Sequence, residues 1–132
     1  MTAFERGPNP FLSGRSQQRV RHVAFKLSGT TLQVFYSRIG DSPESLLMSE
    51  IELAPDWTRW TPSHPVTVLT PEMDFEGADV PVAASTEGAA PGRVRELRDP
   101  DIFIDGTKTY LLYSVAGESG IAIAALKRQP SS

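Results

Sequence analysis

Short apolar stretches separated by turn residues run along most of the chain. Residues 23–27 and 32–37 carry loosely alternating apolar side chains on either side of Ser28-Gly29-Thr30, and this pattern predicts a β-hairpin. After a turn at 39–44, residues 46–53 predict a third strand, although their spacing also fits a short helix. Residues 56–60 and 66–70 are expected to supply an outer strand region. The first half of the chain therefore predicts an antiparallel sheet.

The same plan returns near the C-terminus. Residues 101–104 and 109–114 predict two strands around Asp105-Gly106, a dipeptide typical of tight hairpins, and 121–126 predicts a third strand. Four residues recur with a constant offset of seventy-seven positions: Gly29, Tyr36, Ser37 and Gly40 precede Gly106, Tyr113, Ser114 and Gly117. Repetition of an antiparallel unit is typical of a propeller or a related repeat array. Two unrelated hairpins in a sandwich are the alternative.

These patterns divide the chain into five segments. An N-terminal arm or loop is expected over 1–19, a first unit over 20–70, a second unit over 97–126 and a polar tail over 127–132. Between the units, residues 71–96 contain three prolines and three glycines, which predicts a long Pro/Gly-rich connecting loop. Loops of this length in compact domains are usually functional or disordered. The fold class that follows is all-β.

Composition narrows the classes of function. A chain of 132 residues fits one compact domain. It contains no cysteine, which excludes disulfides and thiolate metal sites and suits a cytoplasmic protein. The formal net charge of -3 does not suggest a nucleic-acid or membrane partner. The polar N-terminus lacks the apolar core of a signal peptide, so we expect a cytoplasmic location.

Residues 97–124 carry a resemblance to a known family. They contain Arg-Asp-Pro-Asp at 98–101, Tyr-Leu-Leu-Tyr-Ser at 110–114 and Gly-Ile-Ala-Ile-Ala at 120–124. This segment resembles one blade of the five-bladed β-propeller glycoside hydrolases of families 43, 32 and 68. The resemblance implies a partial β-propeller of about two antiparallel blades.

The resemblance also implies a sugar pocket on the propeller axis. Asp99 and Glu76 are the candidate catalytic carboxylates, because glycoside cleavage needs one acid to protonate the leaving oxygen and another to attack or to activate water. Arg98, His22 and Asp101 are candidate substrate-binding residues. The expected partner is a carbohydrate or glycoside, with no cofactor and no metal site. The structural alternatives are that Asp99 pairs with Arg98 and that Glu76 is a solvated loop charge.

The chain departs from this family in two respects. Five blades need roughly 250–300 residues, whereas this chain supplies about two blades. Aligning Phe25 with Phe103 makes Arg21 the counterpart of Asp99, so the first unit is predicted to lack that acid. We therefore expect a fragment or short relative, most like a C-terminal portion. The alternatives are a non-catalytic carbohydrate-binding or interaction module and an inactive truncated propeller that self-associates through its open sheet edges.

Overall fold

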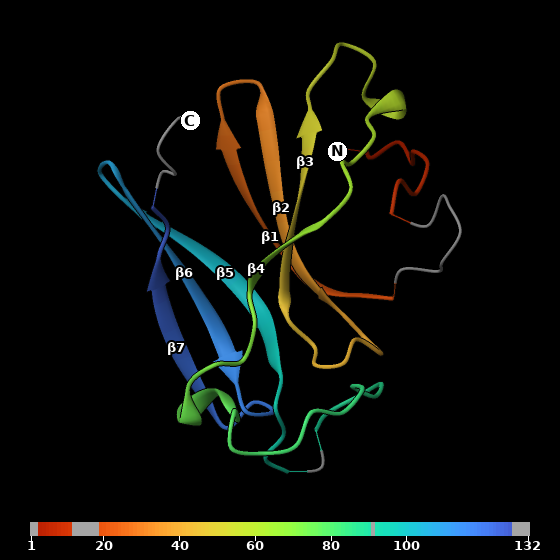
Figure 1. Cartoon of the computed structure of the whole chain (residues 1–132). Helices are drawn as coiled ribbons and strands as arrows, with labels where there is room; N and C mark the ends of the chain where they lie inside the picture. Colours follow the sequence, from red (N-terminus) through yellow and green to blue (C-terminus); the bar gives the residue numbers. More distant parts are fainter. Residues whose placement is uncertain (1–2, 12–18, 91, 128–132) are drawn as a thin grey trace.

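The computed structural model describes residues 3–11, 19–90 and 92–127, and it is all-β (Figure 1). The first sheet has the order β1-β2-β3-β4 and the second the order β5-β6-β7, with every neighbouring pair antiparallel. The strands of the first sheet are β1 (Val20–Ser28), β2 (Thr31–Arg38), β3 (Leu46–Glu52) and β4 (Val66–Leu69). Those of the second are β5 (Leu97–Asp105), β6 (Lys108–Val115) and β7 (Gly120–Ala125). Neither sheet closes on itself.

Two short 3-10 helices lie between the strands: η1 (Trp57–Arg59) and η2 (Asp74–Glu76). The strand region predicted over 56–60 is therefore wrong in this part. Asp56 accepts a hydrogen bond of 3.1 Å from the backbone N–H of Thr58, which gives that group a local partner in place of a strand ladder. Throughout the described ranges, no helix is long and apolar enough to cross a membrane.

The two hairpins that begin the sheets are structurally equivalent. Arg21 pairs with Ser37 in β1 and β2, and Arg98 pairs with Ser114 in β5 and β6. The ladder shifts register directly after each arginine. Arg21 therefore corresponds to Arg98, and the prediction that it corresponds to Asp99 is wrong. Aligning the two phenylalanines moved the repeat by one residue, and a shift of one position places every strand side chain on the opposite face.

The first sheet buries both of its faces. One face, which we call the Phe35 face, also carries Ala24 and Leu46 and packs against the second sheet. The opposite face, the Tyr36 face, carries Val34, Leu47 and Ile51. It is covered by Phe11 from the N-terminal arm, whose ring contacts the Tyr36 ring edge-on at 5.4 Å, and by Trp60. The N-terminal arm thus completes the core on one side.

The second sheet packs onto the first through the face that corresponds to the Tyr36 face of the first sheet. Tyr113, the counterpart of Tyr36, is buried against the Phe35 face together with Leu111 and Val115. The two sheets therefore pack head to tail, with the tyrosine-bearing face of one unit on the phenylalanine-bearing face of the other. The remaining face of the second sheet contains Leu112, and no sheet formed by the described residues covers it. Its side chains include Phe103, Ile121 and Ile123, which are 56%, 78% and 61% exposed.

Candidate functional site

Each unit contains a β-bulge in its first strand, and each bulge holds a polar residue of the candidate site. Between Arg21 and Ala24 of β1, and between Arg98 and Asp101 of β5, the strand has one residue more than its partner. His22 occupies the first bulge and Asp99 the second. Asp99 has a φ of 51°, in the left-handed region that few residues other than glycine adopt. Bulges re-aim side chains and recur next to active sites.

His22 and Asp99 meet where the units come together. Nδ1 of His22 lies 2.9 Å from Oδ1 of Asp99, and Oδ2 accepts a hydrogen bond of 3.0 Å from the Ser114 hydroxyl. The side chain of His22 is 76% exposed and that of Asp99 is 32% exposed. A carboxylate held in this way fixes the orientation of the imidazole ring through Nδ1, and Nε2 is the ring nitrogen that this contact does not use. The pair can accept and donate hydrogen bonds to a ligand hydroxyl.

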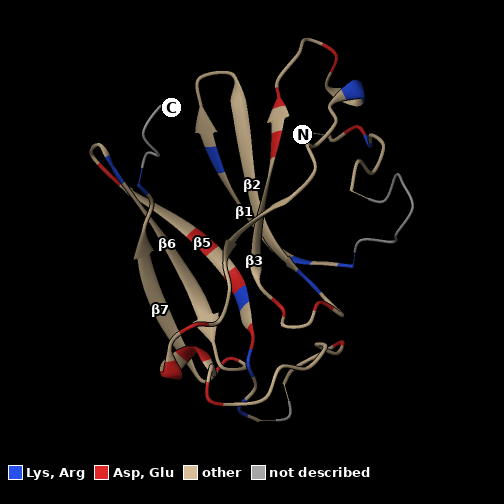
Figure 2. Cartoon of the chain, in the orientation of Figure 1, with Lys and Arg blue, Asp and Glu red and all other residues tan. Residues whose placement is uncertain are grey.

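Arg98, expected to bind substrate, is enclosed by protein groups. It is 2% exposed and forms an ion pair with Glu96. Its NH1 donates to the Gly88 carbonyl at 3.1 Å and lies 3.4 Å from the half-exposed Glu118 carboxylate. Figure 2 shows acidic and basic positions following one another along β5 and the segment before it. The Arg98 guanidinium thus connects β5 to the long loop and to the turn between β6 and β7.

A single buried carboxylate lies between the two repeated arginines. Glu44, in the turn between β2 and β3, is 0% exposed. Its Oε1 is 3.0 Å from Nε of Arg21, and its Oε2 is 3.4 Å from Nε of Arg98, the latter without hydrogen-bond geometry. The hydroxyls of Ser37 and Ser85 donate to the same carboxylate at 3.1 and 2.7 Å. These neighbours compensate a charge that would be costly to bury alone.

Glu76, the second predicted catalytic carboxylate, lies on the other face of β6. It is 3% exposed in η2 and accepts a hydrogen bond of 2.7 Å from the Tyr113 hydroxyl. Its other oxygen accepts from the backbone N–H groups of Glu72 and Met73, both at 3.0 Å. Because Tyr113 and Ser114 are consecutive in a strand, they point to opposite faces. The structure therefore does not bring Glu76 and Asp99 into one pocket.

Asp101 lies just beyond the second bulge and is exposed. Its carboxylate accepts a hydrogen bond of 2.9 Å from the backbone N–H of Ile102. It corresponds by register to Ala24, which is buried under the second sheet. Asp101 therefore belongs to the uncovered Leu112 face.

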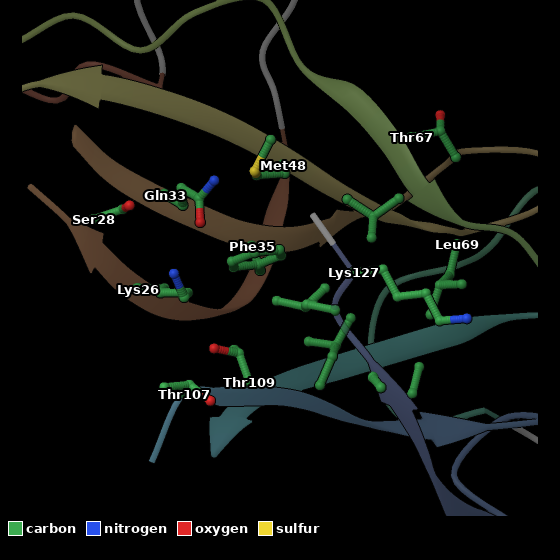
Figure 3. Close-up of a pocket in the computed structure, with 15 residues that line it drawn as sticks. Lys26, Ser28, Gln33, Phe35, Met48, Thr67, Leu69, Thr107, Thr109 and Lys127 are labelled. Atoms are coloured by element: carbon green, nitrogen blue, oxygen red, sulfur yellow. The ribbon is translucent and has the colours of Figure 1, made fainter. Parts of the chain in front are cut away.

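A groove of about 680 Å³ lies at the other end of the strands (Figure 3). It lies between the sheets, with Lys26, Gln33 and Phe35 on one side and Thr109 on the other. Leu111 also lines it. None of the predicted site residues lines it. The bulge pair and the groove are thus separate features of the interface between the sheets.

Sequence reasoning missed Glu44, which stands in a Ser-Pro-Glu turn that looks solvated. A constant offset of seventy-seven residues, applied consistently, pairs Arg21 with Arg98 and His22 with Asp99. That signal was sufficient to identify two repeated arginines. Their shared need for a buried counterion could have pointed to an acidic residue in a neighbouring turn.

Comparison with known proteins gives one informative similarity. The chain is 44% identical over 110 residues to an uncharacterized protein of Acanthamoeba polyphaga mimivirus. The match covers 83% of this chain and 31% of that protein, so the chain spans about a third of the length of the curated relative it matches. No protein-family model and no solved structure matches the chain.

Proposed function

We propose that this chain forms two adjacent units of a β-propeller-type, glycoside hydrolase-like protein, and that His22 and Asp99 line its central sugar pocket. The meeting of these two residues carries the proposal. They occupy the same bulge position in two equivalent hairpins and lie 2.9 Å apart. In a ring of units, equivalent positions converge in this way on a common axis.

Head-to-tail packing supports a ring in preference to a two-unit sandwich. In a sandwich related by a two-fold axis, Tyr36 and Tyr113 would both face the interface, whereas here Tyr113 does so and Tyr36 faces the N-terminal arm. Repeating the same contact adds units in one direction until the ring closes. The mimivirus relative has more than two-thirds of its length outside the match and so has room for further units.

The chemistry favours recognition of sugar hydroxyls by this chain. Asp99 keeps part of its carboxylate exposed while Ser114 orients it, and His22 adds a donor or acceptor beside it. Glycosidic cleavage needs a second carboxylate at roughly 5–9.5 Å. Glu76 is engaged on the other face, so in this proposal the second acid comes from another unit. In this proposal the chain by itself binds sugar without cleaving it. We also propose a cytoplasmic location for the protein.

A saccharide titration of the full chain tests this proposal. We expect mono- and oligosaccharides to shift the His22 imidazole resonances, with dissociation constants on the order of millimolar. Asp99→Asn should abolish the shift. Asp105→Asn, which alters an exposed carboxylate at the far end of β5, should preserve it. Unperturbed His22 resonances across the saccharide panel would rule out the sugar pocket.

The catalytic part of the proposal needs the longer protein. The mimivirus relative should hydrolyse at least one member of a panel of aryl glycosides, because it would contain the units that supply the second acid. A folded relative that cleaves none of them would leave the non-catalytic carbohydrate-binding function for this site.

A further inference from the structure

Each residue of the candidate site follows directly after a repeated arginine. His22 follows Arg21 and Asp99 follows Arg98. Both arginines precede a register shift, where the ladder no longer determines the path of the backbone. The place of each bulge residue therefore depends on what holds the arginine before it.

Glu44 holds both arginines with one carboxylate. Oε1 lies 3.0 Å from Arg21 in the first sheet, and Oε2 lies 3.4 Å from Arg98 in the second. The backbone of Glu44 also reaches across, since its carbonyl accepts a hydrogen bond of 2.9 Å from the N–H of Leu97 at the start of β5. The residue thus connects the two units immediately behind the bulges.

The long loop provides a second bridge of the same kind. The carbonyl of Gly88 accepts from NH1 of Arg21 at 3.3 Å and from NH1 of Arg98 at 3.1 Å. Ser85 anchors this part of the loop, because its hydroxyl donates to Glu44 and accepts from the N–H of Gly40 at 2.9 Å. Two acceptors, one charged and one neutral, therefore span the same pair of guanidinium groups.

We infer that Glu44 is a positioning residue that sets the distance and orientation of the His22–Asp99 pair, an inference that rests on the proposed function of that pair as a ligand site. Stability alone does not call for this carboxylate. Apolar side chains can replace a buried ion network at little cost in stability, whereas charges with directional partners specify one arrangement of the elements that they join. In this chain the specified arrangement is the relative position of two bulges.

A variant of Glu44 should therefore alter His22, although the Glu44 side chain contacts Arg21, Ser37, Ser85 and Arg98 and not His22 itself in the part of the chain that the structure describes. We expect Glu44→Gln, followed by nitrogen-15 NMR of the imidazole, to move the His22 resonances to the values of Asp99→Asn. His64 supplies an internal reference in the same spectrum. The affinity for a saccharide that binds the wild type should fall by about tenfold.

Glu118→Gln is the matched control. Glu118 also lies 3.4 Å from Arg98, but it is 45% exposed and contacts one unit, so its variant should leave His22 unchanged. If Glu44→Gln does not fold, Ser85→Ala, which removes one of the hydrogen bonds to Glu44, should shift His22 in the same direction by a smaller amount.

Two results would overturn the inference. One is a folded Glu44→Gln or Ser85→Ala protein with wild-type His22 resonances, and the other is an equal shift in Glu118→Gln. Because the His22 measurement needs no sugar, it tests the positioning role even if no saccharide binds, and the two proposals can fail separately.

Discussion

Arg21 and Arg98 occupy the same position in two equivalent hairpins, and one buried carboxylate, that of Glu44, lies against both guanidinium groups. Arg98 is the more enclosed of the two, with three carboxylates around it. The cluster behind the candidate site is therefore an ion network shared by both sheets. Its removal should affect the whole domain.

Replacing Arg98 should strongly destabilise the protein. In Arg98→Met, Glu44 and Glu96 remain buried with fewer partners, and breaking a buried pair in this way typically costs about 3–5 kcal/mol. Urea unfolding measures the loss. Arg19→Met removes an exposed pair with Glu87 and should cost less than about 1 kcal/mol. Equal losses for the two variants would mean that the cluster has no special stabilising role.

Tyr113 should contribute stability through its hydrogen bond to Glu76. Tyr113→Phe leaves one oxygen of a buried carboxylate without that donor, which is expected to lower the free energy of unfolding by about 1–3 kcal/mol. Tyr110→Phe alters a half-buried tyrosine of the same strand and should change it by less than about 0.5 kcal/mol. Thermal or urea unfolding of both variants compares the two sites.

Alkaline pH should reduce the stability that the hydrogen bond between Tyr113 and Glu76 contributes. Burial, and then the Glu76 carboxylate, raise the pKa of Tyr113 above its ordinary value of 10.0. The unfolded chain therefore releases this proton at a lower pH than the folded protein. The resulting stability is complete below about pH 10 and declines as the pH rises toward the folded pKa. The free energy of unfolding should fall more steeply in this range for the wild type than for Tyr113→Phe, and parallel slopes would contradict the assignment.

Two glycines with nearly the same backbone conformation should respond differently to alanine. Gly77 has a φ of 87° and Gly88 a φ of 88°. A Cβ on Gly77 would lie 2.2 Å from the carbonyl oxygen of Val94, whereas one on Gly88 would meet nothing within 4 Å. Gly88→Ala should therefore cost about 1–2 kcal/mol. Gly77→Ala should cost at least about 2 kcal/mol more, because backbone atoms must move. Unfolding measurements that rank them in the reverse order would refute this reading of the loop.

The uncovered Leu112 face should promote self-association of the isolated chain. Ile121 and Ile123 are exposed on this face. In the first unit the equivalent positions are Leu46 and Met48, which the second sheet covers. Ile121→Lys should raise the monomer fraction in light scattering after size exclusion. Val66→Lys, at an exposed position of the first sheet, should leave it unchanged. A wild-type chain that stays monomeric at high concentration would contradict the prediction that the Leu112 face promotes self-association.

The local elements follow from the amino-acid sequence alone. Alternating apolar residues and the turn glycines Gly29 and Gly106 predicted the hairpins, because period-two burial and a positive φ are local requirements. The recurrence at seventy-seven residues identified two related units. Aligning Phe25 with Phe103 departs from that offset by one residue, and the apolar pattern does not reveal the error, since such a shift preserves most of the pattern while exchanging the two faces.

Only the tertiary structure shows which charged residues lie together at the candidate site. Asp99 and Glu76 look alike in the sequence, but consecutive residues of β6 hold them on opposite faces. Arg98 looks like a ligand-binding residue, yet Glu44 and Glu96 enclose it from distant turns and loops. Burial of a charge depends on partners far away in the chain, and the packing of two sheets is what brings those partners together.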